Sequence, residues 1–150
     1  MSTVDDRLAA AARGTLASLV SPSPEGSPFW QALAAHRVTL PYCSSCRAPF
    51  FYPRPLCPRC GSRDVSTLES SGRGTVYSFC VHFHSALAPL ANAVPFVTAL
   101  VDLAEGPRVP GFLTGVPDDP DLIRCGIPVR AGFLDTADGI TFLTFHPDVS

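Results

Sequence analysis

The sequence contains no lysine, and all eleven of its basic side chains are arginines. Thirteen acidic side chains outnumber them, which gives a formal net charge of −2 and a pI of about 6.0. Nucleic-acid-binding domains usually carry a clustered basic excess. The charge balance therefore argues against a nucleic-acid-binding module, which remains the alternative interpretation of this chain.

Long apolar runs are also missing. Nowhere do 18 apolar residues follow one another, so the sequence predicts no membrane-spanning helix. The first residues carry Asp5 and Asp6 where a secretory signal would be basic, and Arg13 interrupts their apolar part. We therefore expect a cytoplasmic protein. In a reducing compartment, paired cysteines are more often metal ligands than disulfides.

Charged residues make up only 16% of the chain, whereas hydrophobic residues make up 46%. This composition excludes a disordered chain and suggests more apolar surface than a solitary monomer needs. The sixteen prolines and eleven glycines imply many turns and little long helix beyond the N-terminal region. A length of 150 residues suits one compact domain or two very small ones.

Two helices are predicted near the N-terminus. Thr3 is a plausible N-cap for a helix over residues 3–20, because Leu8, Ala12, Leu16 and Leu19 repeat at helical spacing. After a break over residues 21–27, Ser27 caps a second helix whose first residue is Pro28, in the segment PFWQALAAHR.

From residue 72 the pattern changes to a period of two. A strand is predicted over residues 74–84, and further strands over 94–103, 108–115, 127–135 and 140–145, with a short helical turn at 117–123. In the first strand the apolar set should face the core: Tyr77, Phe79, Val81 and Phe83. The other face carries Ser78, Cys80, His82 and His84. Five strands with a short helix between the third and fourth predict a Greek-key OB barrel in a mainly β protein.

Four cysteines form two C-x2-C pairs, Cys43 with Cys46 and Cys57 with Cys60. Two such turns facing each other make a tetrahedral site of four sulfurs, which suits a structural Zn²⁺ ion with no open position for catalysis. A glycine directly follows the second pair and allows its turn, whereas Arg47 follows the first pair. A rubredoxin-like iron site and a pair of disulfides are the alternatives.

The remaining reactive side chains form no convincing catalytic constellation. Cys80 with His82 or His84 is a possible nucleophile and base, but no orienting Asp or Asn lies near them in sequence. The two histidines could instead share a metal ion or lie on a partly exposed strand face. Cys125, like Cys80, is most simply a small apolar residue. An enzyme using Cys80 therefore stays a minor alternative.

Aromatic residues concentrate around the second helix and the cysteine segment: Phe29, Trp30, Phe50, Phe51 and Tyr52. About half of them are expected to pack the helix and the metal site onto the barrel. The others are candidates for a protein interface, where Trp, Phe and Tyr often dominate the binding energy.

These segments together resemble the rubredoxin-like zinc-ribbon plus OB-fold proteins that accompany thiolases and related acyl-CoA enzymes. The resemblance rests on residues 28–33, 43–62, 71–79, 94–108 and 125–133. It implies an N-terminal helix, a zinc ribbon and an OB barrel, divided as a helical extension (1–22), a helix (23–38), a ribbon (39–69) and a barrel (70–147). Residues 1–22 lie outside the matched region.

The resemblance also implies a function. Such proteins are non-catalytic partners of thiolase-fold enzymes, including thiolases, side-chain-cleaving aldolases and acyltransferases of lipid, steroid or polyketide metabolism. They support the assembly of the enzyme and its acyl-CoA binding, and two copies of each chain are expected. Cys43, Cys46, Cys57 and Cys60 become the zinc ligands. The interface or acyl-CoA contacts would include Phe29, Trp30, Leu33, Phe50, Tyr52, Arg54, His82 and His84.

Overall fold

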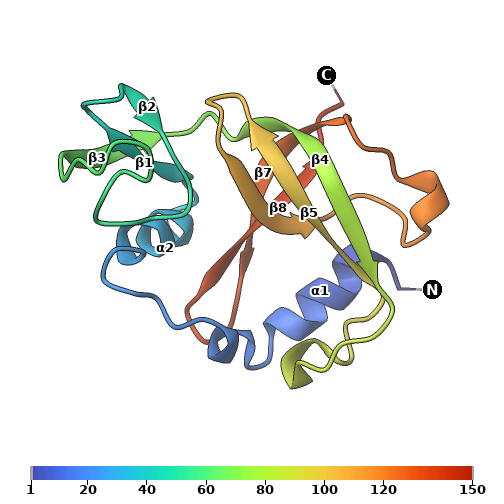
Figure 1. The fold of residues 1–150 in the computed structure, drawn as a ribbon. Helices are drawn as coiled ribbons and strands as arrows, with labels where there is room; N and C mark the ends of the chain where they lie inside the picture. The colour runs from blue at the N-terminus through green and yellow to red at the C-terminus, as the bar shows by residue number, and fades with distance from the viewer. Residues whose placement is uncertain (1, 150) are drawn as a thin grey trace.

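The computed structural model describes residues 2–149 and contains two helices, a small three-stranded sheet and a closed β-barrel (Figure 1). The helices are α1 (Val4–Ala12) and α2 (Ser27–Ala34). The small sheet has the order β2-β1-β3, built from β1 (Thr39–Cys43), β2 (Ala48–Pro49) and β3 (Val65–Glu69). It forms the body that carries the four cysteines.

The barrel has the strand order β4-β5-β6-β8-β7, which confirms the predicted five-stranded OB-type architecture. Its strands are β4 (Arg73–His82), β5 (Phe96–Leu103), β6 (Arg108–Leu113), β7 (Pro128–Asp135) and β8 (Thr141–Pro147). All neighbours are antiparallel except β6 and β8, which pair in parallel at only two positions. The helical turn predicted between the third and fourth strands is a single 3₁₀ turn, Pro120–Leu122.

Strand β4 departs from the predicted alternation. The structure places Tyr77 and Phe83 outside the core, with 52% and 53% of their surface exposed, although both were expected to face inward. A β-bulge between Val76 and Ser78 explains Tyr77, because it inserts one extra residue and reverses which face the following residues occupy. Phe83 lies just past the end of the strand.

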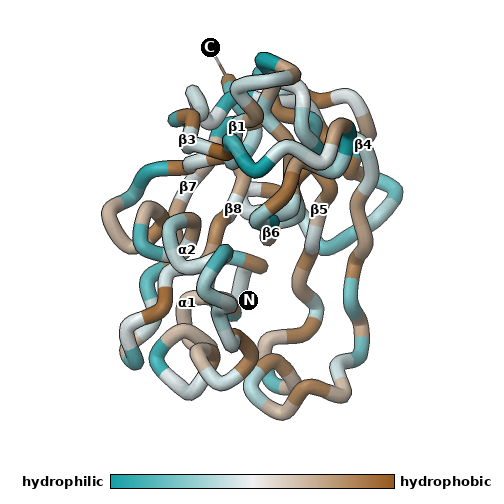
Figure 2. Tube along the Cα trace, turned by 60° about the vertical axis from the view of Figure 1, so that its left-hand side comes forward, coloured by the Kyte–Doolittle hydropathy of each residue, from teal (hydrophilic) through white to brown (hydrophobic). Residues whose placement is uncertain are grey.

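The barrel core is formed by the inward-facing residues of the strands. Along β5 these are Val97, Ala99, Val101 and Leu103, all of which are buried. The β4 residues paired with them are Phe79 and Val81 beyond the bulge and Val76 before it. Figure 2 shows hydrophobic positions recurring along β4 and β5. Alternate residues of β4 therefore face the core on each side of the bulge. They are even-numbered before the bulge and odd-numbered after it.

The N-terminal helix is shorter than predicted. Thr3 caps α1 as expected, accepting a hydrogen bond from the Asp6 amide in a capping box, but the α-helix ends at Ala12. Leu16 lies in a separate 3₁₀ turn, Leu16–Leu19, after a turn that includes Gly14, which is unfavourable inside a helix. The four residues that α1 and this turn bury, Val4, Leu8, Ala12 and Leu16, belong to the same core as the barrel.

Polar contacts also attach α1 to the barrel. The Arg7 guanidinium donates hydrogen bonds to the Pro95 carbonyl at 2.6 and 2.9 Å and pairs with Asp118 at 2.8 Å. Asp5 accepts a hydrogen bond from the Gly115 amide at 2.9 Å. Figure 1 shows α1 below the barrel strands, on the side away from the small sheet. The helix is thus an integral part of the barrel.

Gly74 of β4 lies close against the backbone of β5. An added Cβ would come within 2.5 Å of the Asp102 carbonyl oxygen and 2.6 Å of a Val101 methyl group. Because a backbone oxygen in a closed barrel has little room to move, Gly74→Ala should lower the free energy of unfolding by about 1–3 kcal/mol. Thermal denaturation measures this, with Gly26→Ala as the control, since its Cβ would meet nothing closer than 3.4 Å. Equal melting temperatures for the two variants would contradict the argument.

No helix within residues 2–149 has the length and hydrophobicity required to cross a membrane.

Candidate metal centre and aromatic pocket

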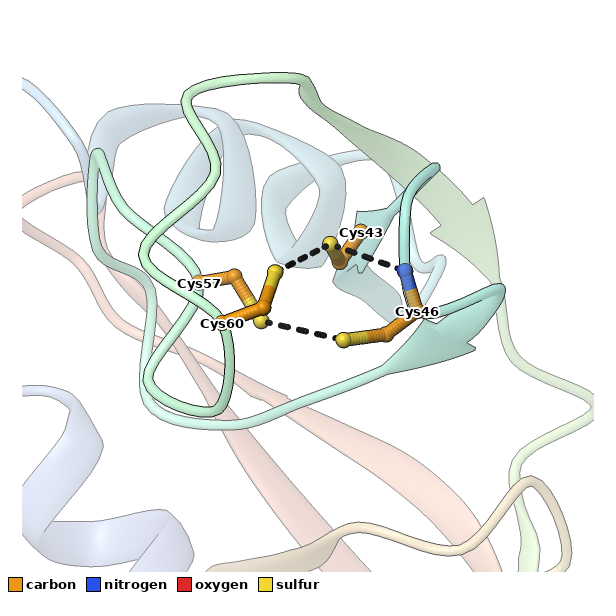
Figure 3. Close-up of side chains that lie close together, drawn as sticks. All are labelled: Cys43, Cys46, Cys57 and Cys60. Atoms are coloured by element: carbon orange, nitrogen blue, oxygen red, sulfur yellow. Dashed lines mark hydrogen bonds between the residues drawn. The ribbon is translucent and has the colours of Figure 1, made fainter.

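The four cysteines converge on one point between two tight turns. Cys43 ends β1 and Cys46 follows in the next turn, while Cys57 and Cys60 come from the second turn. Their side chains point toward one another in Figure 3. The sulfur atoms are 3.7 Å apart for Cys43 and Cys60 and 3.8 Å apart for Cys46 and Cys57, and all four lie within 4.8 Å of one another.

These distances fit a tetrahedral metal site. With Zn–S bonds of about 2.3 Å, the sulfurs of a regular tetrahedron lie roughly 3.8 Å apart. A disulfide bond requires two sulfur atoms about 2.05 Å apart, so the alternative of two disulfides does not describe this arrangement. Four protein sulfurs complete the coordination of Zn²⁺ and leave no position for water or substrate. The site can therefore stabilise a fold, but it does not offer a metal-bound nucleophile.

Both turns that carry the ligands need a left-handed residue. Gly61 has a φ of 74° in the second turn, as predicted, and Arg47 has a φ of 56° in the first. Arginine adopts this conformation at some energetic cost, which glycine would avoid. The turn geometry directs the Cys46 amide at the Cys43 sulfur at 3.3 Å and the Arg59 amide at the Cys57 sulfur at 3.4 Å.

Backbone amides favour the thiolate form at Cys57, whereas hydrogen bonds with the Cys60 and Cys57 thiols raise the pKa of the Cys46 thiol to about 12. Hydrogen bonding from the Cys60 amide, with a smaller contribution from the Arg59 amide, lowers the pKa of the Cys57 thiol to about 6. Phe50 packs beside Cys43 and Cys57 in a small cluster separate from the barrel core. That cluster is too small to stabilise the ribbon by burial, which makes the metal its main source of stability.

A continuous series of aromatic contacts runs from the ribbon to the barrel. Ring centroids 4.6–5.9 Å apart connect eight side chains in the order Tyr52, Phe51, Phe29, Trp30, Phe142, Phe112, Phe96 and His82. All of these contacts are edge-to-face except the last, in which His82 stacks on Phe96. The series connects the ribbon loop, α2 and the barrel into one aromatic array.

Six of these eight side chains line an open hollow of about 330 Å³ between α2, the ribbon loop and the barrel, which we call the aromatic pocket. Its walls include Phe29, Trp30, Phe51 and Tyr52 on one side and Phe112 and Phe142 on the other. The barrel side of the pocket is open because β6 pairs with β8 only through its last two residues, Phe112 and Leu113. The pocket falls within the size range of small-ligand and anchor-residue sites, and its lining is almost wholly apolar.

Comparison with known proteins agrees with this architecture. A family model described as "ChsH2, rubredoxin-like zinc ribbon domain" matches residues 30–66, and a second, "ChsH2, C-terminal OB-fold domain", matches residues 68–134. A chain of the solved structure "Ltp2-ChsH2(DUF35) aldolase" superimposes with a TM-score of 0.75 at 34% identity, covering 85% of this chain and 98% of that chain. The protein belongs to the ChsH2 (DUF35) family.

Two curated proteins are also similar to this chain. The "3-oxo-4,17-pregnadiene-20-carboxyl-CoA hydratase alpha subunit" of Mycobacterium tuberculosis is 40% identical over 130 residues, which are 85% of this chain and 39% of that protein. A "DUF35 domain-containing scaffold protein" of Methanocaldococcus jannaschii is 32% identical over 92 residues, covering 61% of this chain and 63% of that one. This chain therefore spans about two fifths of the hydratase subunit.

The ChsH2 zinc ribbon model confirms the predicted metal, and the four predicted ligands are the ones that converge. Within residues 2–149 they form the only cluster of three or more ligating side chains close enough to hold an ion. The iron alternative has the same ligand set, but the matching ribbon family is a zinc family.

The structure separates the predicted interface residues into buried and accessible ones. Leu33 is fully buried at the base of the aromatic pocket, and Phe50 is only 5% exposed. Leu33 packs from α2 into the main core shared with the barrel, and Phe50 packs beside the metal ligands. Phe29, Trp30 and Tyr52 line the aromatic pocket, and sequence reasoning missed its barrel wall at Phe112 and Phe142.

The Cys80 alternative receives no geometric support. The His82 ring nitrogen lies 2.8 Å from the Thr98 hydroxyl, and its ring stacks on Phe96. The recorded hydrogen bond of the Cys80 thiol goes to the Val81 carbonyl at 3.8 Å. His84 and Cys125 are exposed. In the part of the chain that the structure describes, Cys80 therefore has no base hydrogen-bonded to it.

Proposed function

We propose that this protein is a non-catalytic accessory subunit that binds a thiolase-fold acyl-CoA enzyme and supports its assembly and acyl-CoA binding. The observation that carries the proposal is the match to the DUF35 chain of the aldolase complex, which this chain covers almost completely. The scaffold name of an archaeal relative and the acyl-CoA hydratase name of another point the same way. The partner enzyme would supply the catalytic side chains.

The chemistry of the site supports a structural role. The zinc centre is closed by four sulfurs, so the ion would hold the ribbon and would not activate water. The ribbon then positions Phe51 against Phe29 of α2 and Tyr52 beside Phe51, which completes the aromatic pocket. In this proposal the accessible aromatic residues and Arg54 contact the partner or the acyl-CoA, in a cytoplasmic complex with two copies of each chain.

The test is purification of the tagged chain from its native host, with identification of the proteins that copurify. We expect a thiolase-fold protein to copurify, and we expect about one zinc per copy of this chain, since there is one four-cysteine site. The purified partner should then show higher turnover of an acyl-CoA substrate with this chain than without it. A partner fully active and stable alone would contradict the accessory role.

A further inference from the structure

The aromatic pocket has a charged neighbour. A second hollow of about 230 Å³ lies between the start of α2 and the β1–β3 face of the ribbon, and Phe29 and Pro53 line both hollows. The two therefore form one surface with an apolar half and a polar half. We call this surface the double hollow. Tyr52 lies at its apolar end and is 55% exposed.

The polar half contains two arginines, Arg54 and Arg63. Both are exposed, and neither side chain forms an ion pair or hydrogen bond with any residue between 2 and 149. One acidic residue, Glu25, shares the hollow with them. Five ion pairs elsewhere engage an arginine or histidine. Other arginines in the described part of the chain also lack an ion pair, but Arg54 and Arg63 are the two that line this hollow.

Two other arginines of the ribbon lie beside the metal ligands and not in the hollow. Arg47 and Arg59 belong to the two turns that carry the cysteines. A Zn²⁺ ion with four thiolates has a net charge of about −2, which these two arginines offset. Arg54 and Arg63 line the double hollow instead, so their charge is directed at whatever occupies it.

We propose that the double hollow is the docking site for an extended acidic segment of the partner protein. A large apolar side chain of that segment enters the aromatic pocket, and a neighbouring carboxylate pairs with Arg54 and Arg63. This inference rests on the proposed function, because it names the surface that the partner uses. Its basis is charge complementarity together with the continuity of an apolar anchor pocket and a hollow lined by two arginines.

The observations favour a protein segment over nucleic acid. Single strands bind through aromatic faces on which bases stack, whereas most rings of this array have their edges and faces occupied by one another. The chain as a whole is also acidic, with a net charge of −2, which would repel a phosphate backbone outside this surface. An acidic protein segment requires only the local pair of arginines.

The first experiment uses the isolated full chain with zinc bound. The probe is the acetylated peptide Asp-Glu-Trp-Glu-Asp-amide, and its control replaces the acids with Asn and Gln. We expect the acidic peptide to shift the amide signals of residues 51–63 and the Trp30 indole signal in ¹H–¹⁵N spectra. The neutral peptide should bind the unmodified chain at least about tenfold more weakly than the acidic peptide. The double variant R54E/R63E should no longer bind the acidic peptide more tightly than the neutral one.

The matched control is R13E/R73E, which reverses two exposed arginines outside the double hollow. It should bind the acidic peptide as the unmodified chain does. Equal binding of the acidic and neutral peptides, or shifts at other residues, would overturn the proposal. Tighter binding of decanoate than of the acidic peptide to the same arginines would also overturn it and would indicate a small amphiphile as the occupant. Tighter binding of a twelve-base oligothymidine would indicate nucleic acid.

The second experiment uses the purified thiolase-fold partner. R54E/R63E should weaken the complex by about tenfold or more, and higher salt should weaken the unmodified complex in the same direction. If the partner binds R54E/R63E and the unmodified chain equally well, the docking site is wrong while the proposed function stands. If no thiolase-fold protein binds the unmodified chain, the proposed function fails, and the peptide result decides on the double hollow by itself.

Discussion

Replacing Cys57 by serine should abolish stoichiometric zinc binding and unfold the ribbon. Cys57 is buried, and its sulfur lies 3.8 Å from that of Cys46 in the converged site. A structural zinc site contributes on the order of 10–16 kcal/mol of apparent binding free energy at pH 7. The ribbon has no comparable source of stability, since its own buried cluster contains only Cys43, Phe50 and Cys57.

The measurement combines metal analysis with hydrogen exchange. In Cys57→Ser the zinc content should fall from about one per chain toward zero, and residues 43–65 should lose their protection. The barrel should keep most of its protection, because its core forms a cluster separate from the ribbon cluster. Chelation of zinc from the unmodified chain should reproduce the same pattern.

The chain offers matched controls in its two cysteines outside the site. Cys80 and Cys125 are both exposed, so Cys80→Ser and Cys125→Ser should keep full zinc content and nearly unchanged thermal stability. A soluble Cys57→Ser protein with a protected ribbon and no metal would refute the structural role of the site. Loss of zinc in Cys80→Ser would instead show that the ligand set is wrong.

Removing the buried leucines of α1 and of the 3₁₀ turn that follows it should destabilise the whole barrel. Leu8 and Leu16 are 1% and 0% exposed and share the main core with strands β5 and β7. Each Leu→Ala change should cost about 2–5 kcal/mol, which combines the lost burial with the cavity that remains. Because a domain of this size is stable by only about 5–15 kcal/mol, the double variant should be largely unfolded at 37 °C.

Chemical denaturation of the single variants tests this expectation. Ala9→Ser is the matched control, since Ala9 lies on the exposed side of the same helix and should change stability by less than about 0.5 kcal/mol. If Leu8→Ala and Ala9→Ser have the same midpoint concentration of denaturant, α1 is not part of the cooperative core. Zinc content should stay unchanged in both, which separates this effect from the loss of the ribbon.

Several features followed from the sequence alone because their signals are local. The two C-x2-C turns bring their own sulfurs together, and the second pair is followed by the glycine that its turn needs. Alternation in the first strand and apolar runs bounded by turn residues in the others predicted the five barrel strands, and Thr3 as N-cap predicted the start of α1. In each case the residues that determine the structure are a few positions apart, so spacing and residue type are sufficient.

Other features depended on contacts between distant segments. The bulge that turns Tyr77 outward is set by the pairing of β4 with β5, and the residue types in β4 do not predict it. The burial of Leu33 and Phe50, and the barrel wall of the aromatic pocket at Phe112 and Phe142, likewise depend on how α2, the ribbon and the barrel meet. Local periodicity contains no information about such packing. The metal ligands were therefore determined by sequence, whereas the double hollow was decided only by the tertiary structure.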